Sequence, residues 1–339
     1  MISGGTLVPP FFCTYIWCMK RSFILILLTA TVFHSFSQNP FDGGYRGGTI
    51  NGLKKSTAAL DLLVIGDWGR SGEYFQKEVA LQLGRASYQL GADFIVSTGD
   101  NFYPKGVISV QDPAWKRSFE DIYSAHALQT DWYPVLGNHD YAGDPQAEID
   151  YTKVSRRWNM PARYHSFERV SEDGTKVLFV FMDTSPFEKR YYRDSQEPFR
   201  SNVAAQDTAA QKAWLRKTLA ASTAKWKIVF GHHPIHSAGP RNGQTTDIAS
   251  SLQPDFEKSG VDIYIAGHEH SLQHVQLSTR LHQFVSGAGS EVTPVKEDGI
   301  SRFASAAHGF FTVSINKDGA LFQAVDHEGK IQYETLLKK

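Results

Sequence analysis

Side chains that can bind metal ions or transfer protons follow five short apolar runs in this sequence. Each run ends at a glycine, and the polar residues come directly after it. Apolar runs of this length with a β-branched bias are typical of buried strands, so the polar side chains are predicted to lie at strand ends. The five segments are Gly66-Asp67-Trp68-Gly69, Gly99-Asp100-Asn101-Phe102-Tyr103, Gly137-Asn138-His139-Asp140, Gly231-His232-His233-Pro234 and Gly267-His268-Glu269-His270.

The carboxylate, imidazole, amide and phenol groups of these segments are the ligand types of a metal site. Without a thiolate, such ligands suit borderline to hard ions such as iron, manganese or zinc. An aspartate can bridge two ions, because each of its oxygens can bind one. Two ions held about 3.5–4 Å apart can clamp the attacking and leaving oxygens of an in-line phosphoryl displacement.

Tyr103 narrows the choice of metal. A phenol ionises near pH 10 and is a poor ligand for most divalent ions, whereas a trivalent ion can bind it as phenolate. Tyr103 lies three residues after Asp100 in the same predicted turn, close enough to share an ion with it. The pair therefore favours Fe(III) at one of the two positions.

Each residue taken alone has a simpler explanation. Asp67 could cap a strand end, Tyr103 could be a core aromatic residue, and His139 could be a loop histidine with satisfied hydrogen bonds. The segment His268-Glu269-His270 could be a solvated turn, although residues two apart on an extended segment face the same side. Five such turns, each after an apolar run, favour one shared site over five coincidences.

The composition describes a large globular protein without a charge bias. The chain has 339 residues, of which 35 are Lys or Arg and 35 are Asp or Glu, so its formal net charge is zero. This balance gives no basic excess for nucleic-acid binding. Both cysteines, Cys13 and Cys18, precede Met19, so a chain processed after residue 37 has neither a disulfide nor a thiolate ligand.

Residues 1–37 have the pattern of a secretory signal peptide, and Met19 is the expected true start. A basic Met19-Lys20-Arg21 start, an apolar run over 23–33 and small residues before Gln38 match the three regions of such a signal. Because the run is short for a membrane span, we expect a secreted or periplasmic protein, with an uncleaved anchor as the alternative. Residues 38–60 are predicted to form an irregular segment, and residues 61–339 the main domain.

Predicted strands and helices alternate after residue 60. Helical spacing and capping signals predict helices near 75–90, 112–125, 209–222 and 248–258. Residues 185–207 are polar and lack periodicity, which indicates either a mobile lid or a surface excursion. The sequence after His270 contains consecutive short strands that favour antiparallel pairing, so the fold class is α/β with mixed sheets.

The five glycine-led segments, in this order, resemble the metallophosphoesterase superfamily. The tyrosine at position 103 narrows the resemblance to the purple acid phosphatases, and in particular to their small, mammalian-type, tartrate-resistant branch. The resemblance spans roughly residues 62–335 and implies a four-layer αββα sandwich, in which helices flank two mixed β-sheets. Further matching segments are Gly91-Ala92-Asp93-Phe94-Ile95, Arg156-Arg157-Trp158-Asn159, Trp214-Leu215, Leu272-Gln273 and Ser286-Gly287-Ala288-Gly289.

The resemblance also implies a ligand for each position of a dinuclear centre. The Fe(III) site would comprise Asp67, Tyr103 and His270, with Asp100 as the bridge between the ions. The second site would hold Fe(II), Zn or Mn with Asp100, Asn138, His232 and His268. His139 would contact phosphate or act as an acid.

Two positions depart from the pattern of the tartrate-resistant branch. His233 stands where that branch usually has tyrosine. A histidine that helps protonate the leaving group in that branch is replaced here by Arg241 or Asn242. An arginine cannot donate a proton usefully but can hold phosphate through two N–H groups. The catalytic candidates are therefore His139, His233, His236 and Arg241, with orientation or packing as the alternative role for His233 and His236.

The predicted function is hydrolysis of phosphate monoesters by a metal-activated hydroxide, without a covalent phosphoenzyme. The substrate would be a small phosphomonoester or a phosphoprotein, and we expect a monomer with no nucleic-acid partner and no stable membrane partner. One alternative is a Mn- or Zn-dependent phosphodiesterase or nucleotidase. The other is an extracellular protein that binds phosphate or metal without turnover.

Overall fold

The computed structural model describes residues 48–339, so the predicted signal peptide and Met19 lie outside the described residues. The first strand, β1, begins at Leu60. The strands are β1 (Leu60–Ile65), β2 (Phe94–Ser97), β3 (Asp131–Pro134), β4 (His165–Val170), β5 (Lys176–Phe181), β6 (Trp226–Phe230), β7 (Ile263–Ala266), β8 (Leu272–Gln276), β9 (His282–Ser286), β10 (Ser301–Ser305), β11 (Gly309–Asn316), β12 (Gly319–Asp326) and β13 (Ile331–Leu337).

Six α-helices and four short helical turns connect these strands within the described part of the chain. The α-helices are α1 (Gln76–Leu90), α2 (Asn138–Tyr141), α3 (Pro145–Tyr151), α4 (Phe199–Ala204), α5 (Thr208–Ala221) and α6 (Thr246–Lys258). The helical turns are η1 (Trp115–Glu120), η2 (His126–Leu128), η3 (Ser185–Phe187) and η4 (Lys189–Arg193). No helix of residues 48–339 has the length and apolar character needed to cross a membrane.

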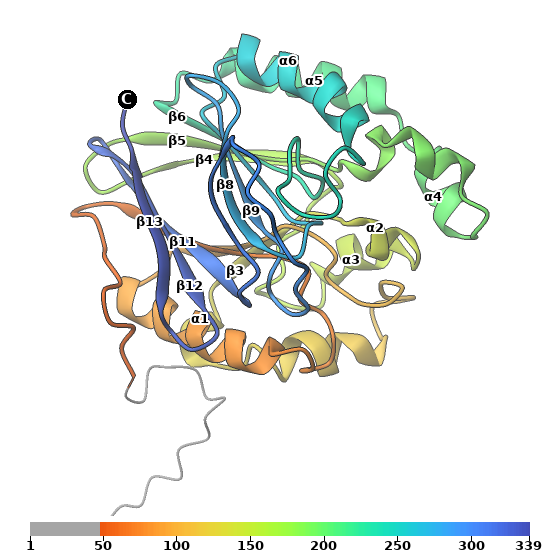
Figure 1. Cartoon of the computed structure of the whole chain (residues 1–339). Coiled ribbons are helices and arrows are strands. Elements are labelled where there is room, and N and C mark those ends of the chain that lie inside the picture. The colour runs from red at the N-terminus through yellow and green to blue at the C-terminus, as the bar shows by residue number, and fades with distance from the viewer. Residues whose placement is uncertain (1–47) are drawn as a thin grey trace, which may run out of the picture. The chain divides into compact units, whose positions relative to one another are not determined.

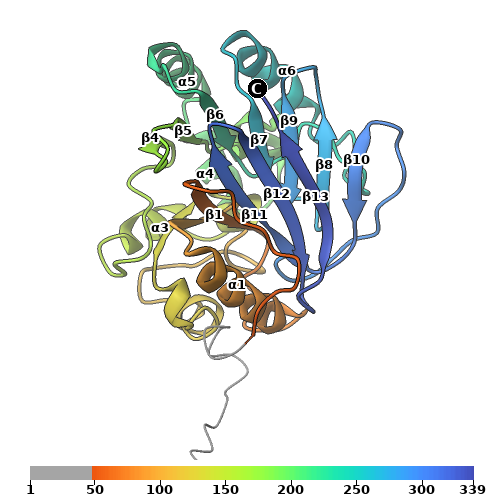
Figure 2. The same ribbon diagram turned by 90° about the vertical axis from the view of Figure 1, so that its left-hand side faces the viewer.

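The strands form two mixed sheets. The first has the order β13-β12-β11-β1-β2-β3, and the second has the order β10-β8-β9-β7-β6-β5-β4. In the first sheet, β1, β2 and β3 are parallel neighbours. In the second, β5, β6, β7 and β9 run parallel to one another. The parallel strands therefore form one end of the first sheet, with β3 at its edge, whereas in the second sheet they lie in the centre between antiparallel strands (Figure 2).

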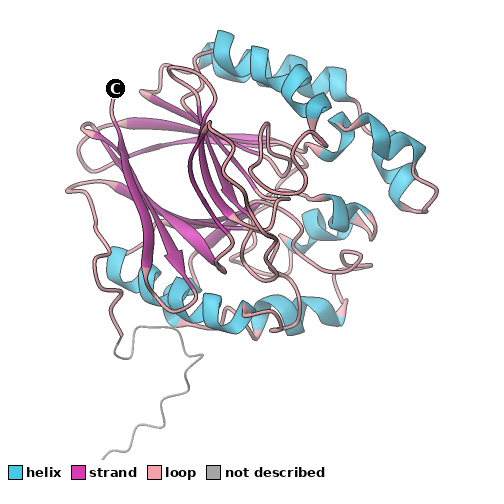
Figure 3. Cartoon of the chain, viewed as in Figure 1, coloured by secondary structure: helices cyan, strands magenta, loops and turns pink. Residues whose placement is uncertain are grey.

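The two sheets pack face to face, and helices cover their outer faces (Figures 1 and 3). Helix α1 lies against the first sheet, and α5 and α6 lie against the second. The predicted αββα sandwich of two mixed sheets is therefore confirmed. The predicted helices near 75–90, 209–222 and 248–258 correspond to α1, α5 and α6.

The alternation of side chains along the strands explains these layers. In β1, Leu62 and Val64 belong to the apolar cluster between the sheets, whereas Leu63 and Ile65 belong to the cluster beneath α1. Successive side chains of a strand point to opposite faces, so a strand buried on both faces is apolar throughout. The same holds in β5, where Phe179 faces the other sheet and Leu178 packs toward the α5 and α6 layer.

Two predicted segments differ from the structure. The helix predicted over 112–125 is a π-helical turn, η1, followed by the 3₁₀ turn η2. Residues 185–207 are not a bare loop, because they contain η3, η4 and α4. Tyr191, Phe199 and Val203 of this segment are buried, which attaches it to the body of the domain.

Candidate metal centre

The side chains predicted to bind metal follow the carboxyl ends of strands in both sheets. Asp67, Asp100 and Asn138 follow β1, β2 and β3 of the first sheet. His232 and His268 follow β6 and β7 of the second sheet. Because neighbouring parallel strands end at the same edge of a sheet, the fold brings these side chains to one place.

The turns that carry these residues are tight and strained. Asp67, Asp100 and His268 have positive φ angles of 59°, 49° and 67°, a backbone region that residues other than glycine rarely adopt. Gly137 has no side chain where the backbone of Asp100 passes, and a Cβ there would overlap both the amide nitrogen and Oδ1 of Asp100. Strain of this kind persists only where the surrounding structure imposes it, and it is common at functional sites.

The first group of polar atoms surrounds the phenol oxygen of Tyr103. This oxygen lies 3.1 Å from Oδ1 of Asp67, 3.1 Å from Oδ2 of Asp100 and 3.1 Å from Nε2 of His270. Nε2 of His270 also lies 3.4 Å from Oδ1 of Asp67. A phenol has a single proton, so it cannot donate to all of these neighbours at once.

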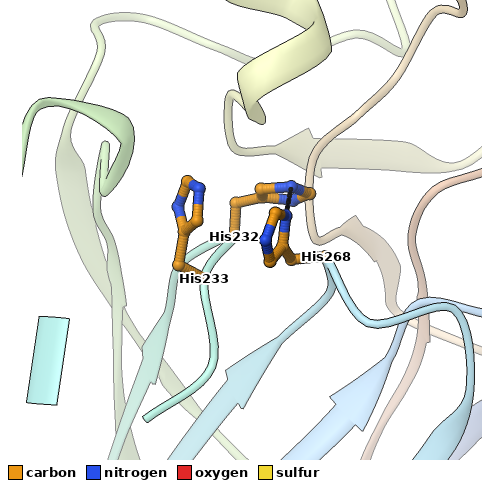
Figure 4. Close-up of side chains that lie close together, drawn as sticks. All are labelled: His232, His233 and His268. Atoms are coloured by element: carbon orange, nitrogen blue, oxygen red, sulfur yellow. Dashed lines mark hydrogen bonds between the residues drawn. The ribbon is translucent and has the colours of Figure 1, made fainter. Parts of the chain in front are cut away.

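The second group surrounds Nε2 of His232. This nitrogen lies 3.3 Å from Oδ2 of Asp100, 3.2 Å from Oδ1 of Asn138 and 3.3 Å from Nδ1 of His268. Figure 4 shows the imidazole rings of His232 and His268 facing each other, with His233 beside them. Oδ2 of Asp100 takes part in both groups, so the two groups are contiguous.

The polar atoms of each group are arranged as ligands of a cation rather than as donor and acceptor pairs of hydrogen bonds. The possible ligand atoms of Asp67, Asp100 and His232 all lie within 4.8 Å of one another, and all three residues are buried. Nδ1 of His232 lies 2.8 Å from the carbonyl oxygen of Thr98, to which it can donate its proton, so that Nε2 remains free to bind an ion. Nε2 of His268 and Nδ1 of His270 are buried without a hydrogen-bond partner among the described residues.

The electrostatics of the groups also favour a bound cation. Burial raises the pKa of the Tyr103 phenol well above its usual range, and the carboxylates of Asp100 and Asp67 raise it further. Burial opposes a charge on His232, but Asp100 outweighs this effect and raises the pKa of its imidazole to about 9. Without a metal, a proton on His232 thus supplies the positive charge that the two buried carboxylates require.

Comparisons with known proteins assign the chain to a family. The family model "Calcineurin-like phosphoesterase" matches residues 60–272. Purple acid phosphatase 17 of Arabidopsis thaliana is 36% identical over 296 residues, which cover 84% of this chain and 86% of that protein. The chain belongs to the purple acid phosphatases.

Two further proteins extend the comparison. Tartrate-resistant acid phosphatase type 5 of Oryctolagus cuniculus is 33% identical over 303 residues, which cover 84% of this chain and 92% of that protein. Among solved structures, GAP50, described as the anchor in the inner membrane complex of Plasmodium, has a TM-score of 0.72 and 26% sequence identity. That match covers 83% of this chain and 89% of the GAP50 chain. This purple acid phosphatase thus has relatives described as phosphatases and one described as an anchor.

His139 of this purple acid phosphatase lies beside the metal groups and is 36% exposed. Its backbone N–H donates to Oδ1 of Asp100 over 2.8 Å, and its ring packs on Tyr103 with the centroids 4.4 Å apart. Nδ1 lies 2.6 Å from the carbonyl oxygen of Pro104, which requires a proton on Nδ1. Nε2 of His139 is then the nitrogen that remains available to a substrate.

His233 is fully buried, and both of its ring nitrogens have partners. The hydroxyl of Thr184 accepts the backbone N–H groups of His232 and His233, each over 3.1 Å, so its own proton is donated to Nδ1 of His233 over 2.9 Å. Nε2 of His233 then carries the proton and donates to the hydroxyl of Tyr191 over 2.9 Å. This network supports a positioning role for His233 rather than proton donation to a substrate.

The other two catalytic candidates, His236 and Arg241, differ in whether they lie near the proposed metal ligands. Nε2 of His236 lies 2.7 Å from a carboxylate oxygen of Asp298, and no hydrogen bond or ion pair in the described chain joins His236 to a proposed metal ligand. Arg241 does lie beside the centre, since it lines one cavity with Asn138 and His268. Its Nη1 donates over 3.1 Å to the buried carboxylate of Glu269, so part of the guanidinium is already engaged.

Sequence reasoning missed two features of the centre. The guanidinium carbon of Arg70 lies 3.8 Å from the ring centroid of Tyr103, and Arg70 also pairs with Glu291 over 2.6 Å. Arg70 directly follows the segment that carries Asp67, and this position was a signal that could have identified it. Tyr191 reaches the centre from the 185–207 segment, whose packing has no local signature in the sequence.

Proposed function

We propose that the protein is an acid phosphatase that hydrolyses phosphate monoesters of small molecules or phosphoproteins at a dinuclear metal centre. The position of Asp100 carries this proposal. Its Oδ2 lies 3.1 Å from the phenol oxygen of Tyr103 and 3.3 Å from Nε2 of His232, so one carboxylate adjoins two different ligand sets. A shared carboxylate of this kind is what a pair of metal ions requires.

The two ligand sets differ in the ions that they suit. The phenol favours Fe(III) in the first set, and the neutral imidazoles and amide of the second suit Fe(II), Zn or Mn. When bound, such ions supply a nucleophilic water near or below neutral pH and offset the charge of the phosphoryl oxygens. The first set is Asp67, Asp100, Tyr103 and His270, and the second is Asp100, Asn138, His232 and His268.

Protein groups around the centre would position the substrate and move a proton. Nε2 of His139 lies 4.0 Å from Oδ2 of Asp100, and in a ring that carries both protons it would donate to a phosphoryl oxygen or to the leaving alcohol. The carbonyl of Thr98 fixes the ring of His232, and the network through Thr184 fixes the chain at His233. Arg241, at the edge of the cavity, would bind phosphate rather than donate a proton.

Metal analysis combined with two chromogenic substrates tests the proposal. Protein purified from residue 38 onward should contain about two metal ions and should hydrolyse p-nitrophenyl phosphate faster than bis(p-nitrophenyl) phosphate. Faster cleavage of the bis-ester would favour the phosphodiesterase alternative instead. His139→Ala should lower kcat about 100-fold while metal content stays at the wild-type value, because positioned acid–base groups contribute 10²–10⁴-fold.

Because GAP50 is described as an anchor, the second candidate function is phosphate or metal binding without turnover. A relative with the same fold is described by its anchoring role, and the resemblance places Arg241 or Asn242 where the tartrate-resistant branch has a catalytic histidine. A protein replete with metal that binds phosphate but turns over neither ester would be a binding protein. That result would refute the phosphatase proposal.

We also propose that residues 1–37 are a cleaved signal, that 38–60 form an N-terminal segment and that 61–339 form one catalytic domain. The basic start at Met19 and the apolar run over 23–33 support export to the periplasm or the medium. N-terminal sequencing of the protein from a cell fraction or medium tests the cleavage site. Light scattering at several concentrations tests the proposed monomer.

A further inference from the structure

A cavity of about 590 Å³ adjoins the proposed metal centre at Asn138 and His268. This volume is within the range of roughly 300–1,000 Å³ that is common for small-molecule sites. It gives room for a whole small substrate rather than for one phosphate group. The residues that line the cavity should therefore determine which substrates the site prefers.

Arginines dominate the charge of the cavity wall. Arg190 and Arg193 come from η4, and Arg241 comes from the loop that follows β6. Asp194 is the only acidic side chain among the described residues that line the cavity. Such a wall favours an anionic group on the substrate, apart from the phosphate that is hydrolysed.

The three arginines differ in how far they are already paired. One N–H group of Arg241 binds Glu269, and Nε of Arg190 lies 3.8 Å from a carboxylate oxygen of Glu188. Both glutamates are buried, so they hold these arginines from behind the wall. The side chain of Arg193 is exposed and forms no hydrogen bond or ion pair with any described residue, so all five of its guanidinium N–H groups remain available to a ligand.

The wall is held in place by contacts to the rest of the domain. Tyr191, between Arg190 and Arg193, is buried and hydrogen-bonded to His233 over 2.9 Å. Nη1 of Arg190 donates over 3.0 Å to the side chain of Gln244, which also lines the cavity. Tyr191 and Arg190 are therefore fixed before an anion binds, and among the arginines of η4 only the side chain of Arg193 has to be ordered by it.

From this arrangement we propose that the arginine wall binds a second phosphate group of the substrate, so that the enzyme prefers phosphomonoesters that carry another phosphate. The inference rests on the proposed phosphatase function. The phosphate to be hydrolysed would lie at the Asn138 and His268 end of the cavity, and the second would lie against Arg190 and Arg193. A guanidinium can bind a phosphate through two parallel N–H groups, which gives specificity as well as affinity.

Matched substrate pairs test the proposal with the metal-replete protein. Fructose 1,6-bisphosphate against fructose 6-phosphate tests a second phosphate ester on a sugar, and adenosine 3′,5′-bisphosphate against AMP tests one on a nucleoside. In at least one pair, the wild-type kcat/KM should be at least tenfold higher for the substrate with two phosphates. Equal kcat/KM values in both pairs would overturn the proposal.

Arginine variants locate the second phosphate. Arg193→Ala should reduce the preference for two phosphates at least fivefold, mainly through KM, and Arg190→Ala together with it should abolish the preference. Arg200→Ala is the matched control, because Arg200 lies on the same segment but does not line the cavity. An equal loss with Arg200→Ala, or no loss with the double variant, would refute the assignment.

A failure of the proposed function gives a different result. If p-nitrophenyl phosphate is not hydrolysed by the metal-replete protein, calorimetric titration with pyrophosphate and with orthophosphate still tests the wall. If pyrophosphate binds more tightly than orthophosphate and Arg193→Ala removes this difference, the arginine wall binds a second phosphate even in a protein without turnover. Equal affinities for the two anions would refute it.

Discussion

His165 should make the domain less stable as the pH falls. It lies on β4, at the edge of the second sheet, and its ring stacks on Phe181 with the centroids 4.6 Å apart. Both ring nitrogens are buried and have no hydrogen bond of good geometry among the described residues, and the backbone of Ala162 only partly offsets the effect of burial on the pKa. Burial lowers the pKa of this imidazole from 6.5 to about 4.

The direction of the effect follows from proton binding. Between pH 6.5 and about 4, the unfolded chain binds a proton at His165 that the folded chain does not bind. The free energy of unfolding therefore decreases as the pH falls through this range. At pH 5 the unfolded group is 1.5 pH units below its pKa of 6.5, which corresponds to a loss of about 2 kcal/mol at about 1.4 kcal/mol per unit.

His165→Phe removes this proton site and retains an aromatic ring against Phe181. The free energy of unfolding, from urea titrations followed by tryptophan fluorescence at pH 7.5 and pH 5, should fall less in the variant than in the wild type. The expected difference between the two decreases is about 2 kcal/mol, and comparing the free energies at one urea concentration within the transition avoids the extrapolation error. Phe167→Leu is the control, because it changes the same aromatic cluster without a titrating group and should shift stability equally at both pH values.

A result in which the wild type and His165→Phe lose the same stability on acidification would refute this reasoning. It would mean that the folded protein accommodates a charged imidazole at position 165 without cost. The loss of stability at low pH would then arise at other groups.

Three further predictions concern the centre and the core. Tyr103→Phe should abolish the pink to violet colour expected of a phenolate bound to Fe(III), which a visible spectrum records; a variant that keeps the colour would contradict the assigned ligand. Gly137→Ala should lower both metal content and kcat, the latter at least 100-fold, because the added Cβ would displace Asp100; elemental analysis with a p-nitrophenyl phosphate assay checks it, and normal metal loading would oppose the role of Asp100. Leu252→Ala should lower the free energy of unfolding by about 2–5 kcal/mol with kcat unchanged, because Leu252 is fully buried on α6, in the apolar cluster between this helix and the second sheet; urea unfolding measures the first value and the phosphatase assay the second.

The strand ends were predictable because their signals are local. An apolar run, a glycine and a polar side chain lie within ten residues of one another, as in the segment from Phe94 to Tyr103. Parallel pairing of neighbouring strands then brings such ends together without further information. The clustering of Asp67, Asp100 and Tyr103 follows from these two facts.

The segments that sequence reasoning misjudged depend on distant partners. The guanidinium of Arg157 donates to the carbonyl oxygens of Tyr123 and Leu128, which precede it by 34 and 29 residues. Tyr191 is buried because His233, 42 residues later, binds its hydroxyl. Neither contact has a periodicity or a motif within its own segment, so local patterns cannot reveal it.

The ligands of the proposed centre are divided between the two sheets of the sandwich. Asp67, Asp100, Tyr103 and Asn138 belong to one sheet, and the three histidines belong to the other. Metal ions bound at the centre would therefore link the two sheets at one end, where apolar packing and hydrogen bonds otherwise join them. A shortage of the metal would then loosen the packing between the two sheets at this end, and the metal-free protein would be cleaved faster by proteases than the loaded protein.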